Sequence, residues 1–542
     1  MTLSEGADVG ERFPITWDDP GEAELSWEWE EMHCPHPLPP LAGDYMLTAI
    51  QDGFNYRLAK FDIPLRFRGR LVNGYLYVAP TAPEGVTLKA ASMKSREVRQ
   101  QQMRVVRAYW DETVFPAATE TYRWMREARV EEATLPEPAG MWEELWQRLR
   151  RLWGLHFMIT SGSYAALDWL IEVYGRAVAG ARPEDALRLV QGTAHELQQV
   201  ERDLHTLAGT ASAHPSVVDH ILNDPHTSLS RLRETTGGPQ VVAALERFLE
   251  QHGHLGHAYD DLSLPSWAEQ PAMILSEIRK RLLQPEDDPE ARRKSLAEEA
   301  EVLAAQVRAG LRDRPDVLRE FDDALKLARD VAPLTEGHNY WLDRMSHAHI
   351  RRFAVRIGSR LARAGVVADP EDVFFLRVAE VGDALRSPRD LRATVVERKA
   401  DVAEWSRLRP PKYLGRPPEV PSASAHFDAP PPEQIDATAL RGVGASPGKV
   451  RGRARVVTSP DDLERVKPGE ILVTVAANPS WVPLFGIISG LVTNTGGVLS
   501  HAAVVAREFR VPAVVGTGEA TRRIRDGQQV ELDGTSGEVR LL

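Results

Sequence analysis

The 542-residue sequence has a single cysteine, Cys34, and little that would take it out of the cytoplasm. One cysteine cannot form an intrachain disulfide or a thiolate metal site, and a reducing compartment fits this best. The first thirty residues are acidic and have no apolar signal-peptide core, so we expect a cytoplasmic protein. The formal net charge of −12 argues against a nucleic-acid-binding surface, which would be basic.

Charged side chains are also missing between Glu470 and Arg507. A membrane helix needs about 20 mostly apolar residues in a row. Here Pro479, Pro483 and the Gly496-Gly497 pair interrupt the stretch. The segment therefore predicts a buried strand, a loop and a helix, and no membrane partner.

The patterns that are present predict an α+β multidomain protein. Residues 1–95 predict short strands and turns, with a hairpin at Asn73-Gly74. Residues 96–408 place apolar residues three and four apart, which is typical of helices. Residues 409–440 are rich in proline and predict a semi-rigid linker, with a long ordered surface loop as the alternative.

Residues 441–542 alternate strand and helix patterns and predict a compact β/α domain. Within it, residues 495–508 read TGGVLSHAAVVARE, a Gly-Gly loop that leads into a helix. Ser500 is expected to cap this helix and to place His501 in its first turn. Arg507 would lie about 9 Å further along the helix on another face, so we expect a packing role for it.

The placement of His501 predicts phosphoryl chemistry. A neutral imidazole is a nucleophile near pH 7, and a helix N-terminus has free N–H groups that would receive a phosphoryl group on the ring. Thr495, Gly496, Gly497 and Ser500 are expected to support that group, because glycine lets a phosphate approach the backbone closely. A capping histidine with no chemistry is the alternative.

Five segments of the C-terminal domain resemble the PEP-utilising enzyme family, which includes PEP synthase and pyruvate phosphate dikinase. They are GVGASPGKVRGRARVV (442–457), GEILVT (469–474), TGGVLSHAAVVARE (495–508), VPAVVGT (511–517) and DGQQVELDGTSGEVRLL (526–542). The resemblance implies that His501 is phosphorylated. It also implies that the domain swings between a nucleotide site and an acceptor site, with the proline-rich segment as the hinge.

Residues 27–41, 248–271 and 478–497 resemble the rifampicin phosphotransferase and phenylphosphate synthase branches more than the PEP-handling enzymes. Asn478 and Asn494 stand where we expect Asp or Glu in those branches. Loss of a carboxylate would change phosphoryl handling or a nearby metal contact.

The sequence shows no ATP-grasp region, no Walker-type phosphate loop and no PEP-binding barrel. The resemblance to phenylphosphate synthase implies that a separate ATP-grasp subunit, holding ATP and Mg²⁺, phosphorylates His501. The carrier would then pass the phosphoryl group to the hydroxyl of a small aromatic molecule. The alternatives are a dehydration or condensation activated by phosphorylation, and a non-catalytic regulatory protein on the same scaffold.

The acceptor site is expected before residue 409. Trp27, His33 and His36 offer an aromatic wall and a general base, with core packing of the tryptophan and surface histidines as the alternative.

A second group of acceptor-site residues would share a helical face if the segment were helical. It comprises His254, His257, Asp260 and Asp261. A helix broken at Gly253 is the alternative, and the incomplete tetrahedral set argues against a metal. Arg344 leads a third, basic group that would steer phosphate, unless it is a solvated helix face.

Overall fold

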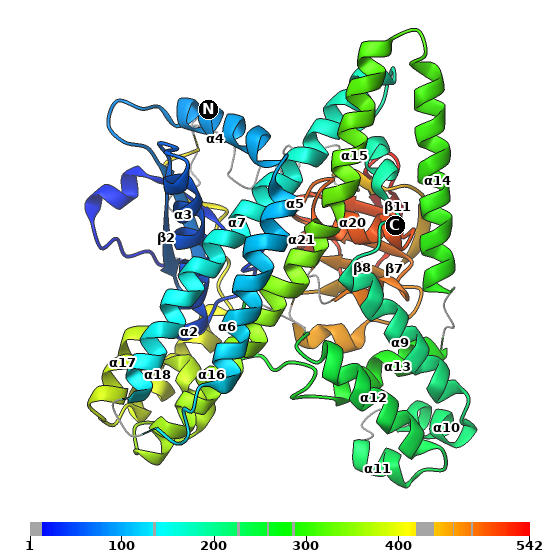
Figure 1. Cartoon of the computed structure of the whole chain (residues 1–542). Helices are drawn as coiled ribbons and strands as arrows, with labels where there is room; N and C mark the ends of the chain where they lie inside the picture. Colours follow the sequence, from blue (N-terminus) through cyan, green and yellow to red (C-terminus); the bar gives the residue numbers. More distant parts are fainter. Residues whose placement is uncertain are drawn as a thin grey trace. The chain divides into compact units, whose positions relative to one another are not determined.

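The computed structural model, drawn in Figure 1, describes most of the chain. The described residues are 13–133, 137–224, 228–256, 260–283, 288–418, 438–458, 460–477 and 481–542. Contacts divide the chain into two units. Unit 1 comprises Met1–Gly162, Tyr259–Leu264 and Trp341–Ala423, and unit 2 comprises Ser163–Ala258, Pro265–Tyr340 and Ser424–Leu542. This division differs from the sequence-based boundaries because each unit is built from three separate segments of the chain.

Unit 1 contains an antiparallel sheet of order β2-β3-β1-β4. Its strands are β1 (Ser26–Trp29), β2 (Arg66–Val72), β3 (Tyr75–Thr81) and β4 (Tyr413–Gly415). The predicted hairpin is confirmed, since Asn73 and Gly74 form its turn with φ of 48° and 75°. Strand β4 lies within the segment predicted as a linker, and residues 419–437 of that segment lie outside the described residues.

Residues 40–60 are helical, where the sequence analysis predicted strands and turns. They form α2 (Pro40–Leu47), the π-helical turn η2 (Thr48–Asp52) and α3 (Gly53–Lys60). Leu41, Tyr45 and Ala49 are buried at a spacing of four, so one helical face carries the core contacts. Prolines at 35, 37, 39 and 40 suggested a turn region, but Pro40 occupies a first helical turn, where proline is tolerated.

The rest of unit 1 is helical, with one apolar core that includes Trp142, Leu149 and Phe353 and another that includes Ala91 and Val98. Its elements are η1 (Pro20–Glu24), α4 (Leu88–Gln102), α5 (Val106–Tyr109), η3 (Trp110–Val114), α6 (Phe115–Glu127), α16 (Met345–Arg363), η6 (Pro370–Phe375), α17 (Val378–Arg386) and α18 (Arg392–Trp405). Helix α7 (Glu137–Ala177) and the turn η5 (Asn339–Arg344) cross the division between the units.

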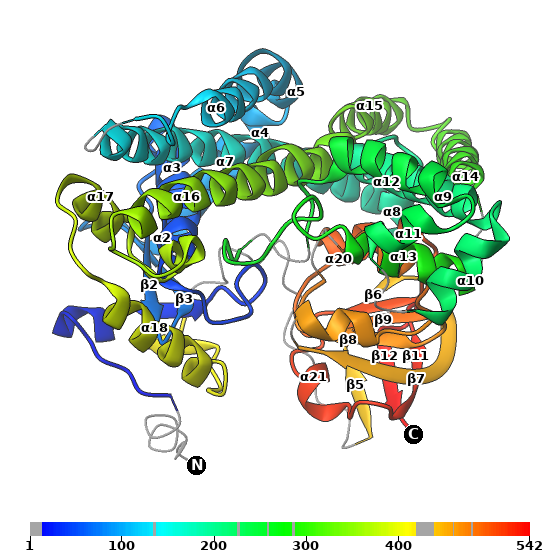
Figure 2. The same cartoon turned by 90° about the horizontal axis from the view of Figure 1, so that it is seen from below.

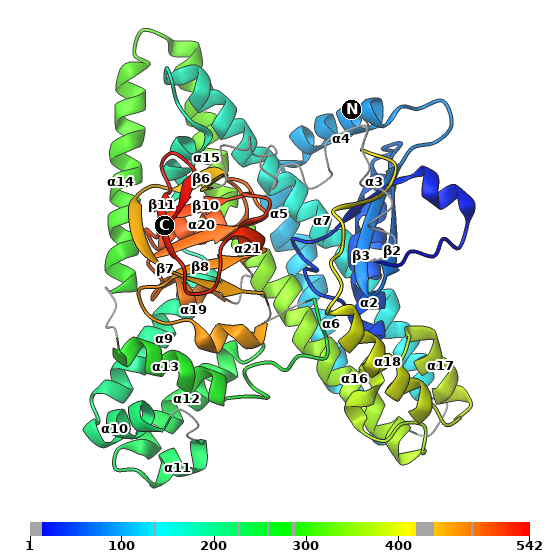
Figure 3. The same ribbon diagram turned by 180° about the vertical axis from the view of Figure 1, so that it is seen from behind.

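The first part of unit 2 is helical. It comprises α8 (Pro183–Leu187), η4 (Arg188–Val190), α9 (Glu196–Ser212), α10 (Pro215–Asn223), α11 (Leu229–Glu234), α12 (Gly238–His252), α13 (Ala272–Leu283), α14 (Pro289–Gly310) and α15 (Pro315–His338). Helices α14 and α15 meet at the loop that joins them and diverge from there in Figures 1 and 3, and Arg308 near the end of α14 donates to Asp322 at 2.7 Å. We call these helices, with the part of α7 in unit 2, the helical region.

The C-terminal part of unit 2 is an eight-stranded sheet of order β5-β12-β11-β7-β8-β9-β10-β6. Its strands are β5 (Ala439–Arg441), β6 (Val443–Ser446), β7 (Lys449–Val457), β8 (Ile471–Thr474), β9 (Gly490–Thr493), β10 (Ala513–Val515), β11 (Gln529–Asp533) and β12 (Glu538–Leu541). Strands β7 to β10 are parallel, and the predicted β/α alternation is confirmed. We call this part the carrier domain.

Four short helices complete the part of the carrier domain that the structure describes. They are η7 (Pro460–Arg465), α19 (Val482–Phe485), α20 (His501–Glu508) and α21 (Ala520–Arg523). Helix α20 packs against β6 and β10 (Figure 2). Segment η7 is a 3₁₀ helix, and the residue before it, Ser459, lies outside the described residues. Among the residues that the structure describes, no helix is long and apolar enough to cross a membrane.

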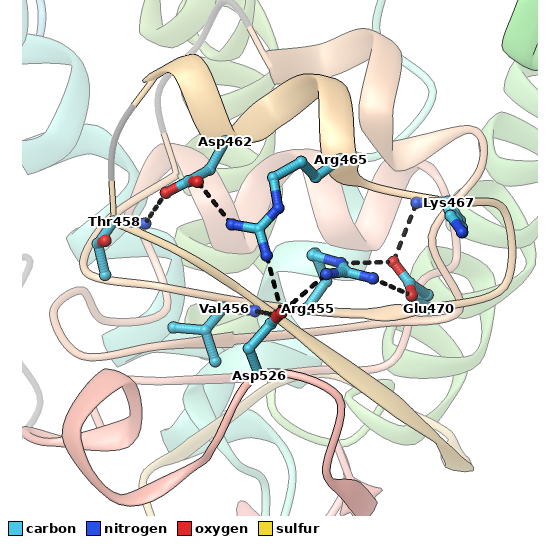
Figure 4. A network of polar contacts seen from close by, with 8 residues as sticks. All are labelled: Arg455, Val456, Thr458, Asp462, Arg465, Lys467, Glu470 and Asp526. Carbon is cyan, nitrogen blue, oxygen red and sulfur yellow. Dashed lines mark hydrogen bonds and ion pairs between the residues drawn. The ribbon is translucent and has the colours of Figure 1, made fainter.

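A charged network ties together the loops of the carrier domain (Figure 4). Arg455 donates to both carboxylate oxygens of Glu470, at 2.9 and 2.8 Å, and to Asp526 at 2.8 Å. Asp526 also accepts from Arg465 at 2.9 Å. The side chains of Arg455 and Glu470 are each 9% exposed, whereas that of Arg465 is 53% exposed.

Replacing Arg455 by alanine is expected to destabilise the carrier domain by about 3 kcal/mol, because it leaves Glu470 as a buried charge without its partner. Arg465→Ala, a matched loss of a more exposed arginine from the same network, is expected to cost less than about 1 kcal/mol. Urea titration followed by hydrogen exchange of β7 and β11 peptides measures both variants. Equal losses of stability in the two variants would contradict this assignment.

Candidate functional site

The loop that carries His501 follows strand β9. Gly496 has a φ of 106°, and a Cβ there would lie 2.9 Å from the hydroxyl of Ser500, so the turn requires glycine. The Ser500 hydroxyl accepts from the amide of Ala503 at 3.4 Å and donates to the carbonyl of Gly497 at 2.8 Å. The predicted cap is therefore confirmed, and His501 is the first residue of α20.

Two neighbouring side chains fix this loop to the sheet. The Thr495 hydroxyl donates to the carbonyl of Val475 at 3.1 Å. The Asn494 amide donates to the Thr521 hydroxyl at 2.8 Å and accepts from the Thr521 amide at 3.0 Å. An asparagine supplies both the donor and the acceptor here, which a carboxylate could not do. Asn478 lies outside the described residues.

His501 is held through one ring nitrogen and leaves the other unused. Its Nδ1 lies 2.6 Å from Oε2 of Glu336, near the end of α15, and the two side chains are 11% and 3% exposed. A carboxylate partner places the ring proton on Nδ1 and leaves a lone pair on Nε2. Nε2 is buried and has no hydrogen-bond partner among the described residues. In the neutral ring, Nε2 is therefore the nitrogen that keeps a lone pair.

The environment of Glu336 keeps it ionised. Burial alone would raise the pKa of this carboxyl, but His501, and then His195 and His338, together lower it below its ordinary value. The charge of Glu336 thus stabilises positive charge on the His501 ring, as the carboxylate does in a Ser-His-Asp triad.

A second histidine–carboxylate pair lies near the first. Nε2 of His195, the residue before α9, contacts the two carboxylate oxygens of Glu508 at 2.9 and 3.0 Å. Burial lowers the pKa of His195, but Glu508 and Glu336 outweigh this and raise it above its ordinary value. Glu508 ends α20, seven residues after His501, so both side chains lie on one face of that helix.

Further contacts join the carrier domain to the helical region. Leu499 is buried in an apolar cluster with Leu170, Ala304 and Phe321. The Arg292 guanidinium lies 4.4 Å from the ring centre of Phe509, and Arg510 donates to Ser295 at 2.9 Å. Arg182 donates to the carbonyl of Thr535 at 2.8 Å. We call this arrangement the docked state.

Arg507 takes no part in the phosphate site. It is buried, and its guanidinium donates to the carbonyl of Ala445 at 3.1 Å, which confirms the predicted packing role. Burial lowers its pKa to about 10.

The structure brings together some of the predicted acceptor-site residues in unit 1. Burial would lower the pKa of His33, but the charges of Glu30, Asp343 and Asp260 raise it, so these groups lie near one another. Burial raises the pKa of Tyr45, with the charge of Asp343 adding to this and that of Arg344 opposing it.

Three more side chains that the sequence did not point to extend this polar cluster. His156 pairs with Asp343 at 2.9 Å, and the Tyr122 hydroxyl lies 2.9 Å from that of Ser346. We call the whole group the unit 1 polar cluster. It comprises Glu30, His33, Tyr45, Tyr122, His156, Asp260, Asp343, Arg344 and Ser346.

Other predicted acceptor residues lie elsewhere. Trp27 is buried in an apolar cluster with Tyr75 and Tyr77, and its indole donates to the carbonyl of Glu22 at 2.8 Å, so the packing alternative describes it. His36 is only partly buried. Asp261 accepts from the amide and hydroxyl of Ser263 at 2.8 and 2.7 Å, and burial raises its pKa.

The helix expected over residues 252–261 is not formed where the structure describes this segment. Helix α12 ends at His252, and Gly253 caps it, as the alternative held. His254 belongs to unit 2, whereas Asp260 belongs to unit 1. The ring of His254 packs edge-on to that of Tyr340, with the two ring centres 4.5 Å apart. His257 lies outside the described residues.

The alternative given for the third group, a solvated helix face, does not describe most of its members, and of the group only Arg352 is exposed. Arg344, His347, His349 and Arg351 are all buried in unit 1. Arg351 donates to the carbonyls of Leu262 and Ser263, at 3.1 and 2.9 Å. These side chains are therefore enclosed in the structure, and Arg344 belongs to the unit 1 polar cluster.

Comparison with known proteins matches both sides of the docked state. The PEP-utilising enzyme mobile domain matches residues 466–537, which include His501 and Glu508. The fourth domain of rifampicin phosphotransferase matches residues 156–336, which include His195 and Glu336. Both parts of the docked state are therefore similar to domains of PEP-utilising enzymes.

The curated relatives that the chain matches are longer than the chain itself. It is 31% identical to chondramide synthase cmdD of Chondromyces crocatus, over 98% of this chain and 14% of that protein. It is 31% identical to rifampicin phosphotransferase of Streptomyces sviceus, over 72% of this chain and 44% of that protein. It is 24% identical to the uncharacterised phosphotransferase YvkC of Bacillus subtilis, over 95% of this chain and 61% of that protein.

Proposed function

We propose that this chain is the histidine-carrier and acceptor-binding component of an ATP-dependent phosphotransferase. The observation that carries the proposal is the His501 ring, which sits at a helix N-terminus with Nδ1 bonded to Glu336 and a lone pair on Nε2. The same geometry activates histidine in other enzymes that transfer a group through it. The match to the mobile domain of PEP-utilising enzymes supports the same role.

The proposed reaction has two steps. In the first, Nε2 attacks the phosphorus of a donor, a new N–P bond forms and the donor's bond to phosphorus breaks. In the second, the hydroxyl oxygen of an acceptor attacks in line with the N–P bond, which breaks and returns the electron pair to Nε2. The hydroxyl proton passes to a nearby base, for which His33 is our choice.

A separate ATP-grasp subunit, holding ATP and Mg²⁺, is the proposed donor of the first step. The resemblance to phenylphosphate synthase, in which one subunit takes ATP and another carries the histidine, supports this division. No residue of this chain is assigned to ATP or Mg²⁺.

The unit 1 polar cluster is the proposed acceptor site. It combines tyrosine side chains with histidine, carboxylate and guanidinium groups, as sites for small polar aromatic molecules do. Arg344 would stabilise charge on the transferred phosphoryl group, and His33 would take up the proton of the hydroxyl. A small aromatic alcohol or phenol is the proposed acceptor class.

The test uses phosphoramidate, a small donor that needs no partner protein. We expect the purified chain to gain one phosphoryl group that is labile in acid and maps to the peptide containing His501. Isolated labelled chain is then mixed with phenol, benzyl alcohol or water alone. Transfer to a hydroxyl compound, with the mass of a phosphate ester, supports the proposal, and a dehydrated or condensed product would replace it. A label that maps to another peptide, or no label, would overturn it.

A further inference from the structure

The docked state contains two histidine–carboxylate pairs of opposite polarity. In the first, the carrier domain provides the histidine, His501, and the helical region provides the carboxylate, Glu336. In the second, the helical region provides the histidine, His195, and the carrier domain provides the carboxylate, Glu508. Because both carrier residues lie on one face of α20, the two pairs form and break together when that face docks or leaves.

In the docked state, Nε2 of His501 is also shielded from solvent. Nε2 of His501 has essentially no surface exposed to solvent and no hydrogen-bond partner among the described residues. A phosphoryl donor needs about 3 to 3.5 Å of approach along the line of attack. The donor therefore cannot reach Nε2 until α20 leaves the helical region.

We propose that His195 and Glu508 form a latch that holds the carrier domain docked and so controls access of a phosphoryl donor to His501. The inference rests on the proposed role of His501 and adds two positioning residues to it. Neither residue touches the transferred group. Both act through the position of α20.

The latch depends on pH because His195 titrates near neutrality. Its pKa is raised in the docked state, so docking binds a proton and is favoured fully below the ordinary pKa of about 6.5. This contribution is lost as the pH rises through the raised pKa. Charged groups face His195 or line the adjoining pocket: Glu508 from α20, Glu336 from α15, Glu196, Glu201 and Arg202 from α9, and Arg292 and Arg293 from α14.

The experiment compares the rate of His501 labelling by phosphoramidate in the full chain with that in His195→Gln and Glu508→Gln, from about pH 6 to about pH 9. The ratio of variant to wild type removes the pH dependence of the donor and of His501 itself. We expect each variant to be labelled about tenfold faster at about pH 6, because each loses a charge-assisted hydrogen bond, and within about twofold at about pH 9. The double variant should be no faster than either single variant.

Arg510→Gln is the matched control, because it removes an exposed ion pair with Glu299 between the same two regions. Its rate should stay within about twofold of wild type at every pH. Single variants that match wild type throughout, or a ratio that does not change with pH, would overturn the latch.

Hydrogen exchange of the α20 peptide without donor measures docking independently of phosphorylation. Faster exchange in both variants at low pH, converging with wild type at high pH, supports the latch, and identical exchange overturns it. If no chain becomes labelled, the proposed role of His501 as phosphoryl carrier is wrong. Hydrogen exchange still tests whether His195 and Glu508 hold the carrier domain docked.

Discussion

Replacing His501 by alanine is expected to abolish phosphoryl labelling of the chain, by phosphoramidate and by an ATP-grasp partner alike. The ring supplies the only atom to which the proposed reaction joins phosphorus, and alanine offers no lone pair in its place. Since no alternative nucleophile has been assigned, the loss should be complete rather than partial. Intact-protein mass spectrometry under neutral conditions, where a phosphohistidine survives, measures the result.

Two controls separate chemistry from folding. His195→Gln removes the other histidine of the docked state and should still become labelled, at a rate that is equal to or higher than that of wild type. Alanine is a good helix former, so His501→Ala should keep α20 folded, but it leaves the Glu336 charge buried without its partner and so weakens docking. Full labelling of His501→Ala would assign the phosphoryl group to another residue.

The sequence predicted the parts of the site that depend on local structure. The Gly-Gly loop, the Ser500 cap and the start of α20 are set by residues within a few positions of one another. The alternation of strands and helices over residues 441–542 was predicted for the same reason, because alternating and buried apolar runs are short-range signals. Local physics alone places His501 in a first helical turn.

The partners of this histidine could not be predicted, because they come from remote parts of the chain. Glu336 is separated from His501 by 165 residues and His195 from Glu508 by 313 residues. No periodicity or spacing connects such positions, and a buried glutamate in a helix looks like any other acidic residue in the sequence. Glu336 lies among apolar core positions of α15, which is the one local sign that its charge is enclosed.

The errors in unit 1 share a cause. A solvated helix face was the alternative for Arg344 and its neighbours, because charged residues are mostly exposed. Tertiary contacts enclose them instead: Arg351 bonds to two backbone carbonyls, and Arg344 lies beside the charge of Asp343 and the ring of Tyr45. Propensity describes a helix in isolation and says nothing of what packs on its face.

Phosphorylation of His501 is itself expected to expel the carrier domain from the docked state. A phosphoryl group on Nε2 would carry a charge of about −1.5 to −2 and would stand about 5 Å from the Glu336 carboxylate. At an effective dielectric constant of about 20, each unit charge costs about 3 kcal/mol at that distance. The Nδ1 hydrogen bond to Glu336 returns only about 1.5 to 3 kcal/mol, so repulsion wins. The enclosed Nε2 also leaves no room for the group.

The expected result is a shift of at least about 100-fold towards the open state in the labelled chain, which corresponds to about 2.7 kcal/mol. Hydrogen exchange of the α15 peptide around Glu336 and of α20 should rise on labelling, and Glu336→Gln should weaken that response because it removes one of the two repelling charges. Equal exchange before and after labelling would contradict the argument. In the expected case, the charge of the phosphoryl group on His501 separates α20 from the helical region, to which unphosphorylated His501 binds through Glu336. Phosphorylation of the carrier domain and its release from the docked state therefore have the same electrostatic cause.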